Sequence, residues 1–206
     1  MFYFLLAFAA VLATTANAGH LIRDVEGVPV FNGSYYLLPR LYKAYGGLTL
    51  SSRGDNQCPL YVGLELHDYN RGIPVIISHW LSTVDYIYET EDLYIKMDVN
   101  ATTCAQPTYW SDPPARTVIE GVFIVAGPRP SSGSFQIKKT ENLIGSYKIM
   151  FCPTGKDCTD VGLFVDHADG VLRLALGFPP YIIVPFEFVF VKATGTETSS
   201  QTMSII

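Results

Sequence analysis

Short runs of β-branched and aromatic residues, separated by Gly, Pro, Asn and Asp, follow one another through most of the chain. Runs of this length between turn residues predict β-strands, and no long helical period interrupts them. Ten such runs at spacings near a dozen residues predict an all-β barrel or sandwich. The predicted strands are residues 34–38, 60–66, 75–78, 93–99, 117–125, 135–139, 147–151, 161–165, 171–175 and 182–191.

Three Gly-Ser-aromatic triplets hint at an internal threefold repeat, which favours a barrel. They are Gly33-Ser34-Tyr35, Gly133-Ser134-Phe135 and Gly145-Ser146-Tyr147, and each enters a predicted strand. Triplets of this kind also arise by chance in a chain with 17 Gly and 13 Tyr, so the repeat carries little weight alone.

The two ends of the chain differ from the rest. Residues 2–13 are almost all apolar, and Ala16-Asn17-Ala18 matches a cleavage site, so we predict a signal peptide over residues 1–18. A membrane anchor is the alternative, but the run is short for a span of about 20 residues. Residues 193–201 are polar and lack aromatics, which predicts a flexible tail over residues 193–206. A single domain, residues 19–192, is expected between them, in a secreted or vacuolar protein.

Four cysteines follow the predicted leader: Cys58, Cys104, Cys152 and Cys158. An even number in a secreted chain predicts two disulfides, for which three pairings exist. A local bridge between Cys152 and Cys158 around a turn-like segment is the simplest choice, and it leaves Cys58 with Cys104. A zinc site would need closer ligand pairs such as C-x-x-C, which the sequence lacks.

Charge and short motifs limit the classes of partner and ligand that we expect. The net charge of −5 and the lack of a basic cluster argue against nucleic acid. The four histidines have no metal-ligand spacing, so we expect surface or turn positions for them, and neither metal nor cofactor. Sequons at Asn32 and Asn100 mark possible glycosylation sites in surface loops.

Several longer segments of the chain form a recognisable series. They are, in order, IRDVEGVPVFNGSYYLLP from Ile22, GGLTL from Gly46, QCPLYV from Gln57, RGIPVIIS from Arg71, PTYW from Pro107, GSYKIMFCP from Gly145 and CTDVGLFVDHADGVLRLAL from Cys158. This series resembles the plant Kunitz, or soybean-trypsin-inhibitor-like, family of protease inhibitors. The resemblance implies a β-trefoil, a pseudo-threefold barrel of twelve strands, with disulfides Cys58–Cys104 and Cys152–Cys158. It also implies an inhibitor without catalytic residues, which offers an exposed, substrate-like loop to a serine endopeptidase.

The resemblance places the reactive loop at residues 79–85. Counting without gaps from Ser78 puts Ser82 at the primary specificity position and Thr83 after the scissile bond; a one-residue slip would present Leu81 instead. Trypsin's specificity pocket holds a buried carboxylate that requires Arg or Lys, so Ser82 predicts weak trypsin inhibition. Asn32 matches the family's loop-supporting Asn, a role that a glycan on the same amide would remove.

Other interpretations stay open. A Kunitz-like protein that has lost inhibition and serves in storage, defence or carbohydrate binding is the main alternative; a glycosidase would need two carboxylates about 5–10 Å apart, which no spacing indicates. We expect a monomer that is not an enzyme. Trp80 and Tyr109 are candidate exposed binding anchors, whereas Trp110 is expected in the core. Residues 166–170 are interpreted as a hairpin turn rather than a calcium or acid–base site.

Overall fold

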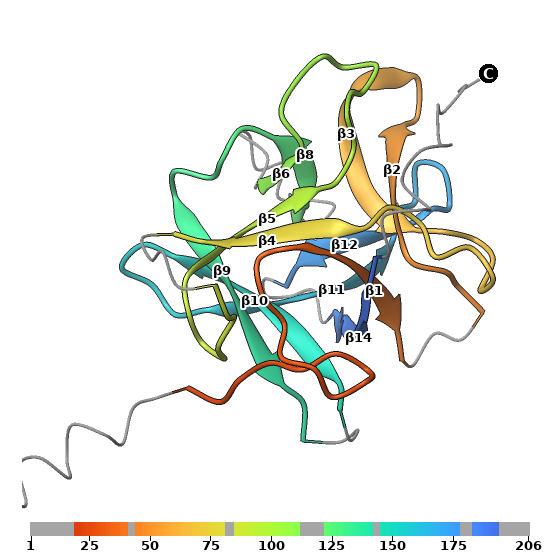
Figure 1. Ribbon diagram of the computed structural model, residues 1–206. Helices are drawn as coiled ribbons and strands as arrows, with labels where there is room; N and C mark the ends of the chain where they lie inside the picture. Colours follow the sequence, from red (N-terminus) through yellow and green to blue (C-terminus); the bar gives the residue numbers. More distant parts are fainter. Residues whose placement is uncertain are drawn as a thin grey trace, which may run out of the picture.

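The structure, a computed structural model, describes residues 19–40, 44–80, 85–111, 122–141, 145–177 and 183–193. The predicted signal peptide and residues 194–206 of the predicted tail lie outside the described residues. Regular secondary structure in these ranges consists of β-strands (Figure 1), which confirms the expected all-β class. Within the same ranges, no helix has the length and apolarity needed to cross a bilayer.

The described residues form fourteen strands of one sheet. Two pairs of consecutive strands are separated by a single residue: Ile124 lies between β7 and β8, and Phe186 lies between β13 and β14. Counting each pair as one segment leaves twelve segments, the number that the family resemblance predicts. The strands are β1 (Ser34–Pro39), β2 (Leu48–Arg53), β3 (Asn56–Leu64), β4 (Val75–His79), β5 (Leu93–Met97), β6 (Tyr109–Ser111), β7 (Val122–Phe123), β8 (Val125–Gly127), β9 (Gly133–Lys139), β10 (Tyr147–Pro153), β11 (Thr159–Val165), β12 (Leu172–Leu176), β13 (Val184–Pro185) and β14 (Glu187–Lys192).

Six of these strands close into a barrel. β1 pairs with β4, β4 with β5, β5 with β9, β9 with β10, β10 with β14, and β14 with β1, always antiparallel. The last pair joins the two ends of the domain, since Tyr35 lies opposite Lys192 and Pro39 opposite Phe188. Closure of the ring satisfies the backbone groups that an open sheet would leave at its edges.

Three hairpins complete the fold. β2 pairs with β3, β6 with β8, and β11 with β12, and the hairpins pair with one another through β3–β8, β3–β12 and β7–β12. Each third of the chain, β1–β4, β5–β9 and β10–β14, therefore supplies two barrel strands and one hairpin (Figure 1). This arrangement is the predicted β-trefoil.

The threefold echo in the sequence is only partly structural. Gly33 and Gly145 precede β1 and β10, the first strands of the first and third repeats. Gly133 instead begins β9, the last strand of the second repeat, whose first strand is β5. Two of the three triplets therefore occupy equivalent places.

Alternating side chains of the barrel strands fill the core. In β5, for example, Leu93, Ile95 and Met97 are buried while Tyr94 and Lys96 are partly exposed. Trp110 is completely buried, as expected, and its ring lies edge-on to Phe135 at 5.8 Å between centroids. The inward residues of the other barrel strands are Tyr35, Leu37, Val75, Ile77, Ile137, Tyr147, Ile149, Phe151, Phe188 and Phe190.

Two strands were missing from the sequence prediction, β2 and β6. β2 follows Gly46-Gly47, which has the composition of a turn, and its second half is Ser-Ser-Arg rather than an apolar run. β6 has only three residues, too few for a period to be visible. Both belong to the hairpins, where pairing with a longer partner strand stabilises a segment of weak intrinsic preference.

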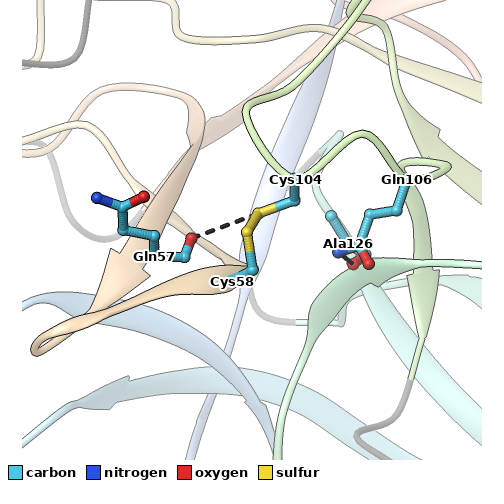
Figure 2. Close-up of a disulfide and its surroundings, with 5 residues drawn as sticks. All are labelled: Gln57, Cys58, Cys104, Gln106 and Ala126. Carbon is cyan, nitrogen blue, oxygen red and sulfur yellow. Dashed lines mark hydrogen bonds between the residues drawn. A yellow bond between two sulfur atoms is a disulfide. The ribbon is translucent and has the colours of Figure 1, made fainter.

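Both disulfides have the predicted pairing. Cys58 on β3 is bonded to Cys104, and Cys152 at the end of β10 is bonded to Cys158 just before β11. Figure 2 shows the first bond, with the Cys104 sulfur 3.3 Å from the Gln57 carbonyl oxygen. Nearby, the Gln106 amide donates a 2.8 Å hydrogen bond to the Ala126 carbonyl, so the loop after β5 is held to both β3 and β8.

Candidate functional site

The segment between β4 and β5 contains the predicted reactive loop. β4 ends at His79 and β5 begins at Leu93, so residues 80–92 connect two neighbouring barrel strands. Leu81, Ser82 and Thr83 lie outside the described residues. The structure describes both ends of the loop, which we call the first stem (residues 78–80) and the second stem (residues 85–88).

The first stem is held by backbone and ring contacts. The Trp80 amide donates a 2.9 Å hydrogen bond to the Asp92 carbonyl. The Trp80 ring stacks on Tyr94 of β5, with centroids 4.7 Å apart and planes 19° from parallel. Trp80 is therefore partly buried rather than a free anchor, and it leads the chain into the loop from a fixed position.

The second stem is held by the N-terminal segment of the domain. Asn32 donates its backbone amide to the Asp85 carbonyl at 2.8 Å, and Ile87 donates to Val30 at 2.9 Å. Ile22 in turn donates to the Ile87 carbonyl at 3.1 Å, and the Ile87 side chain is completely buried. Residues 85–88 are thus fastened at alternate positions like a short strand.

Asn32 lies beside the loop, as the resemblance implies. Its side-chain Nδ2 donates to the Asp85 carboxylate at 3.5 Å, the upper limit of a hydrogen bond, and the residue is exposed. The backbone of Asn32 therefore contributes more to holding the second stem than its side chain does. Exposure also leaves the amide accessible for glycosylation, and the competition between these two roles stays a prediction.

His79 connects the two stems, which the sequence analysis did not foresee. Its Nε2 lies 3.0 Å from the Tyr86 carbonyl, and its Nδ1 lies 3.4 Å from a Glu91 carboxylate oxygen. The same Glu91 oxygen accepts a 3.2 Å hydrogen bond from the Tyr88 amide. The imidazole is only 3% exposed and His79 is the last residue of β4, so the surface or turn position expected for His79 is wrong. No motif signalled this contact, because it depends on the fold bringing position 79 next to position 86.

A hollow of about 290 Å³ lies beside the first stem. Trp80 and Asp92 line it together with residues of β9 and β10 and with Thr154. The Asp92 carboxylate accepts hydrogen bonds from the Ser134 hydroxyl and, at 3.1 Å, from the Gln136 amide. These bonds join the loop end to β9.

Residues 166–170 form the predicted hairpin turn between β11 and β12, with Gly170 at φ +74°. The turn also carries an ion-pair network that the sequence did not reveal. Asp169 accepts two hydrogen bonds, of 2.6 and 2.8 Å, from the fully buried Arg173, and Asp166 accepts two, of 2.6 and 3.1 Å, from Arg53. The network is structural, because its charged groups pair with one another at the turn.

These contacts determine the pKa values of both carboxyls. The hydrogen bonds from Arg173 lower the pKa of Asp169 to about 2, although burial acts in the opposite direction. Burial raises the pKa of Asp166, but the hydrogen bonds from Arg53 and the Ala168 amide outweigh it and the net shift is downward. Both groups are therefore ionised at neutral pH. Among the described residues, no group of three or more His, Cys, Asp or Glu could hold a metal ion.

The comparisons with known proteins agree with the fold. A family model described as "Trypsin and protease inhibitor" (Kunitz_legume) matches residues 22–192. Kunitz trypsin inhibitor 4 of Arabidopsis thaliana is 39% identical, over 98% of this chain and 95% of that protein. The alpha-amylase/subtilisin inhibitor of Oryza sativa subsp. japonica is 31% identical, over 87% of this chain and 90% of that protein.

Solved structures give the same result. Soybean trypsin inhibitor, in its orthorhombic complex with porcine pancreatic trypsin, superposes with a TM-score of 0.71 at 30% identity. The match covers 84% of this chain and 99% of the soybean chain. The family match spans nearly the whole described domain, and its relatives bear the names of inhibitors rather than enzymes. The chain belongs to the Kunitz family of plant trypsin and protease inhibitors.

Proposed function

We propose that this protein inhibits a serine endopeptidase by presenting residues 80–85 as a substrate-like loop, with Ser82 at the primary specificity position and Thr83 after the scissile bond. The observation that carries the proposal is that both stems are hydrogen-bonded to residues that lie just before barrel strands, Asp92 before β5 and Asn32 before β1. Trp80 is bonded to Asp92, and Asp85 to Asn32. A loop closed between two fixed ends loses little conformational entropy when a protease binds it.

The mechanism requires no catalytic group in the inhibitor. The protease serine attacks the carbonyl carbon of the residue at the specificity position, as it would in a substrate. Fastened stems keep the new amine and the acyl group near each other, so resealing competes with release of the cleaved chain. His79, which contacts the Tyr86 carbonyl and Glu91, positions the second stem relative to the first.

Specificity follows from the size of Ser82. A hydroxymethyl side chain suits a small pocket of the elastase type, and it leaves the carboxylate of a trypsin pocket unpaired. Leu81, reached by a one-residue slip, would suit a larger apolar pocket. Relatives named for trypsin and for subtilisin occur among the similar proteins, so the target panel includes both classes.

The test is an inhibition assay of the oxidised domain, residues 19–206, against trypsin, chymotrypsin, elastase and subtilisin. The wild type is compared with Ser82→Arg, and with Ser52→Arg as a matched change at an exposed position on the β2–β3 hairpin. We expect the wild type to inhibit elastase or subtilisin, and Ser82→Arg to gain at least about a hundredfold in affinity for trypsin. Ser52→Arg is expected to behave as the wild type.

Two outcomes would contradict the proposal. Equal trypsin inhibition by the Ser82 and Ser52 variants would place the specificity position elsewhere. Failure of the wild type and of Ser82→Arg against all four proteases would favour the alternative of a non-inhibitory storage, defence or carbohydrate-binding protein.

The proposal includes passage through the secretory pathway. Two disulfides within one domain suit an oxidising compartment, and residues 1–18 would be removed after Ala18. Expression in plant cells followed by N-terminal sequencing tests this proposal: Gly19 is the expected first residue, and retained residue 1 would contradict it. The same preparation would show a monomer by light scattering and would reveal whether Asn32 or Asn100 is glycosylated.

A further inference from the structure

Four side chains form a ladder that starts at the first stem of the loop and crosses the neighbouring strands. We call Trp80, Tyr94, Arg129 and Tyr109 the aromatic ladder. Trp80 stacks on Tyr94 at 4.7 Å, and the Arg129 guanidinium carbon lies 4.8 Å from the Tyr94 ring centroid and 4.9 Å from that of Tyr109. The guanidinium is thus held against two rings, and Trp80 connects it to the loop. The Trp80 and Tyr109 singled out in the sequence both belong to this surface.

Arg129 is held in one orientation before any partner arrives. One of its terminal nitrogens donates a 3.1 Å hydrogen bond to the Tyr109 hydroxyl, which also raises the pKa of Arg129. Pro128 and Pro130 flank it, and each restricts the backbone of the short segment between β8 and β9. Ring contacts and prolines together reduce the entropy that an arginine ordinarily loses on binding.

Among the described residues, this cation has no carboxylate partner. The ion pairs that these residues form include those of Arg53, Arg173, Lys148 and His79, and none involves Arg129. A guanidinium has five N–H donors, so the hydrogen bond to Tyr109 leaves several that are free to bind an acceptor. An exposed, oriented guanidinium with free donors matches a carboxylate, which it can bind through two parallel hydrogen bonds.

We propose that Arg129 binds an Asp or Glu carboxylate on the surface of the endopeptidase that docks on the loop. This inference rests on the proposed function. A standard interface covers about 800 Å² on each partner, which corresponds to a radius of about 16 Å. Arg129 lies two ring contacts away from Trp80, which borders the loop, and therefore falls within that footprint. A polyanionic surface fits less well, because the protein carries a net charge of −5.

The test measures the association and dissociation rates of the complex with an immobilised protease from the panel that the wild type inhibits, at 50 and 300 mM NaCl. Arg129→Gln removes the charge, and Tyr109→Phe removes only the hydroxyl that orients it. Arg40→Gln is the matched control. Arg40 is exposed, and it follows the end of β1 that does not pair with β4. Thermal unfolding verifies that every variant is folded.

We expect Arg129→Gln to weaken binding about tenfold and to reduce its salt dependence. Tyr109→Phe is expected to weaken binding two- to threefold, roughly, through faster dissociation, and Arg40→Gln to leave both rates unchanged. Equal affinity of Arg129→Gln and the wild type would overturn the carboxylate contact while the loop proposal stands. Absence of wild-type binding to every protease of the panel would overturn both, and the two failures are therefore distinguishable.

Discussion

At the scale of single residues, Arg173 is the most deeply buried charged residue that the structure describes. Arg173 is completely buried on β12, and its charge is compensated by Asp169 in the adjacent turn and by Asp166 at 3.2 Å. A further hydrogen bond of 2.6 Å goes to the Ser52 carbonyl on β2. The guanidinium therefore fastens the hairpin of the third repeat to that of the first.

We predict that Asp169→Asn weakens this link and alters the acid sensitivity of the fold. The wild-type carboxyl, with a pKa near 2 in the folded state against about 3.8 unfolded, stabilises the fold above about pH 4. That contribution is lost as the pH falls from about 5 to 2. The variant should be less stable at pH 7 by about 1–2 kcal/mol, and it should lose less on acidification.

Urea unfolding at several pH values between 7 and 2, followed by tryptophan fluorescence, measures both effects. Asp68→Asn is the control, because Asp68 is exposed in the loop between β3 and β4. If the stability curves of the wild type and Asp169→Asn run parallel across this pH range, the lowered pKa of Asp169 does not contribute to the acid sensitivity of the fold.

At this scale the sequence identifies turns from local signals, but it does not identify the distant residues that contact them. Residues 166–170 were correctly interpreted as a turn, since Asp-Gly is a local signal. The partners of that turn were not predictable, because Arg53 lies 113 residues from Asp166 in the chain. The contact of His79 with the second stem was hidden for the same reason. Asn32 was placed beside the loop only through the family resemblance.

At the scale of elements, the start of β2 lies so close to the loop before β4 that the contact depends on glycine. Gly72 has φ +70°, and a Cβ built there would lie 2.2 Å from the Leu48 carbonyl oxygen at the start of β2. Ile73 donates a 2.6 Å hydrogen bond to that same carbonyl. The loop before β4 is therefore pressed directly onto β2.

We predict that Gly72→Ala destabilises the protein by at least about 2 kcal/mol, because positive φ and a backbone clash act together. Gly27→Ala separates the two causes: Gly27 has φ +79°, but a Cβ there would meet nothing within 4 Å. Its expected cost is about 1 kcal/mol, from backbone conformation alone. Differential scanning calorimetry of the two variants gives the comparison, and equal costs would show that β2 can move away from the new methyl group.

Two further glycines explain why the sequence did not predict β2. Gly46-Gly47 has the composition of a turn, yet its function is to let β2 begin immediately beside the Asn70–Arg71 backbone. Long apolar runs such as those of β10 and β14 were found because their pattern is local. Short hairpin strands gain their stability from pairing across the fold, which no local pattern records.

At the scale of the whole molecule, two cross-links of different reach stabilise the fold. Cys58 and Cys104 are separated by 46 residues and connect the first repeat to the second, whereas Cys152 and Cys158 are separated by 6 residues within the third. A cross-link restricts the unfolded chain more when it closes a longer loop. We predict a loss of about 4 kcal/mol for the Cys58→Ser/Cys104→Ser variant and of roughly 2 kcal/mol for Cys152→Ser/Cys158→Ser.

Guanidinium unfolding of the two double variants beside the wild type tests this order. The shorter cross-link also closes the hairpin that lines the hollow next to Trp80. Its loss should therefore weaken protease inhibition more than its effect on stability alone suggests. A larger stability loss for the shorter link would mean that local geometry outweighs chain entropy here.

Closure of the barrel makes the fold depend on both ends of the domain at once. β14 pairs with β1 and β10, and it buries Phe188 and Phe190 completely. Without β14 the ring would open between β1 and β10, and two large aromatic side chains would be missing from its centre. Each such side chain contributes about 3–5 kcal/mol, which together approach the whole stability of a typical domain.

We therefore predict that two truncations differ sharply in effect. Removal of residues 194–206 should shift the melting temperature by less than about 2 °C, because the last described contact, from the Ala193 amide to the Ser34 carbonyl at 2.9 Å, is retained. Removal from Glu187 onward should abolish cooperative unfolding and protease inhibition together. Circular dichroism during heating measures both truncations. A cooperative transition in the longer truncation would show that an open sheet of five barrel strands is enough to hold the loop stems. Closure of the barrel would then slow unfolding of the protein rather than determine its fold.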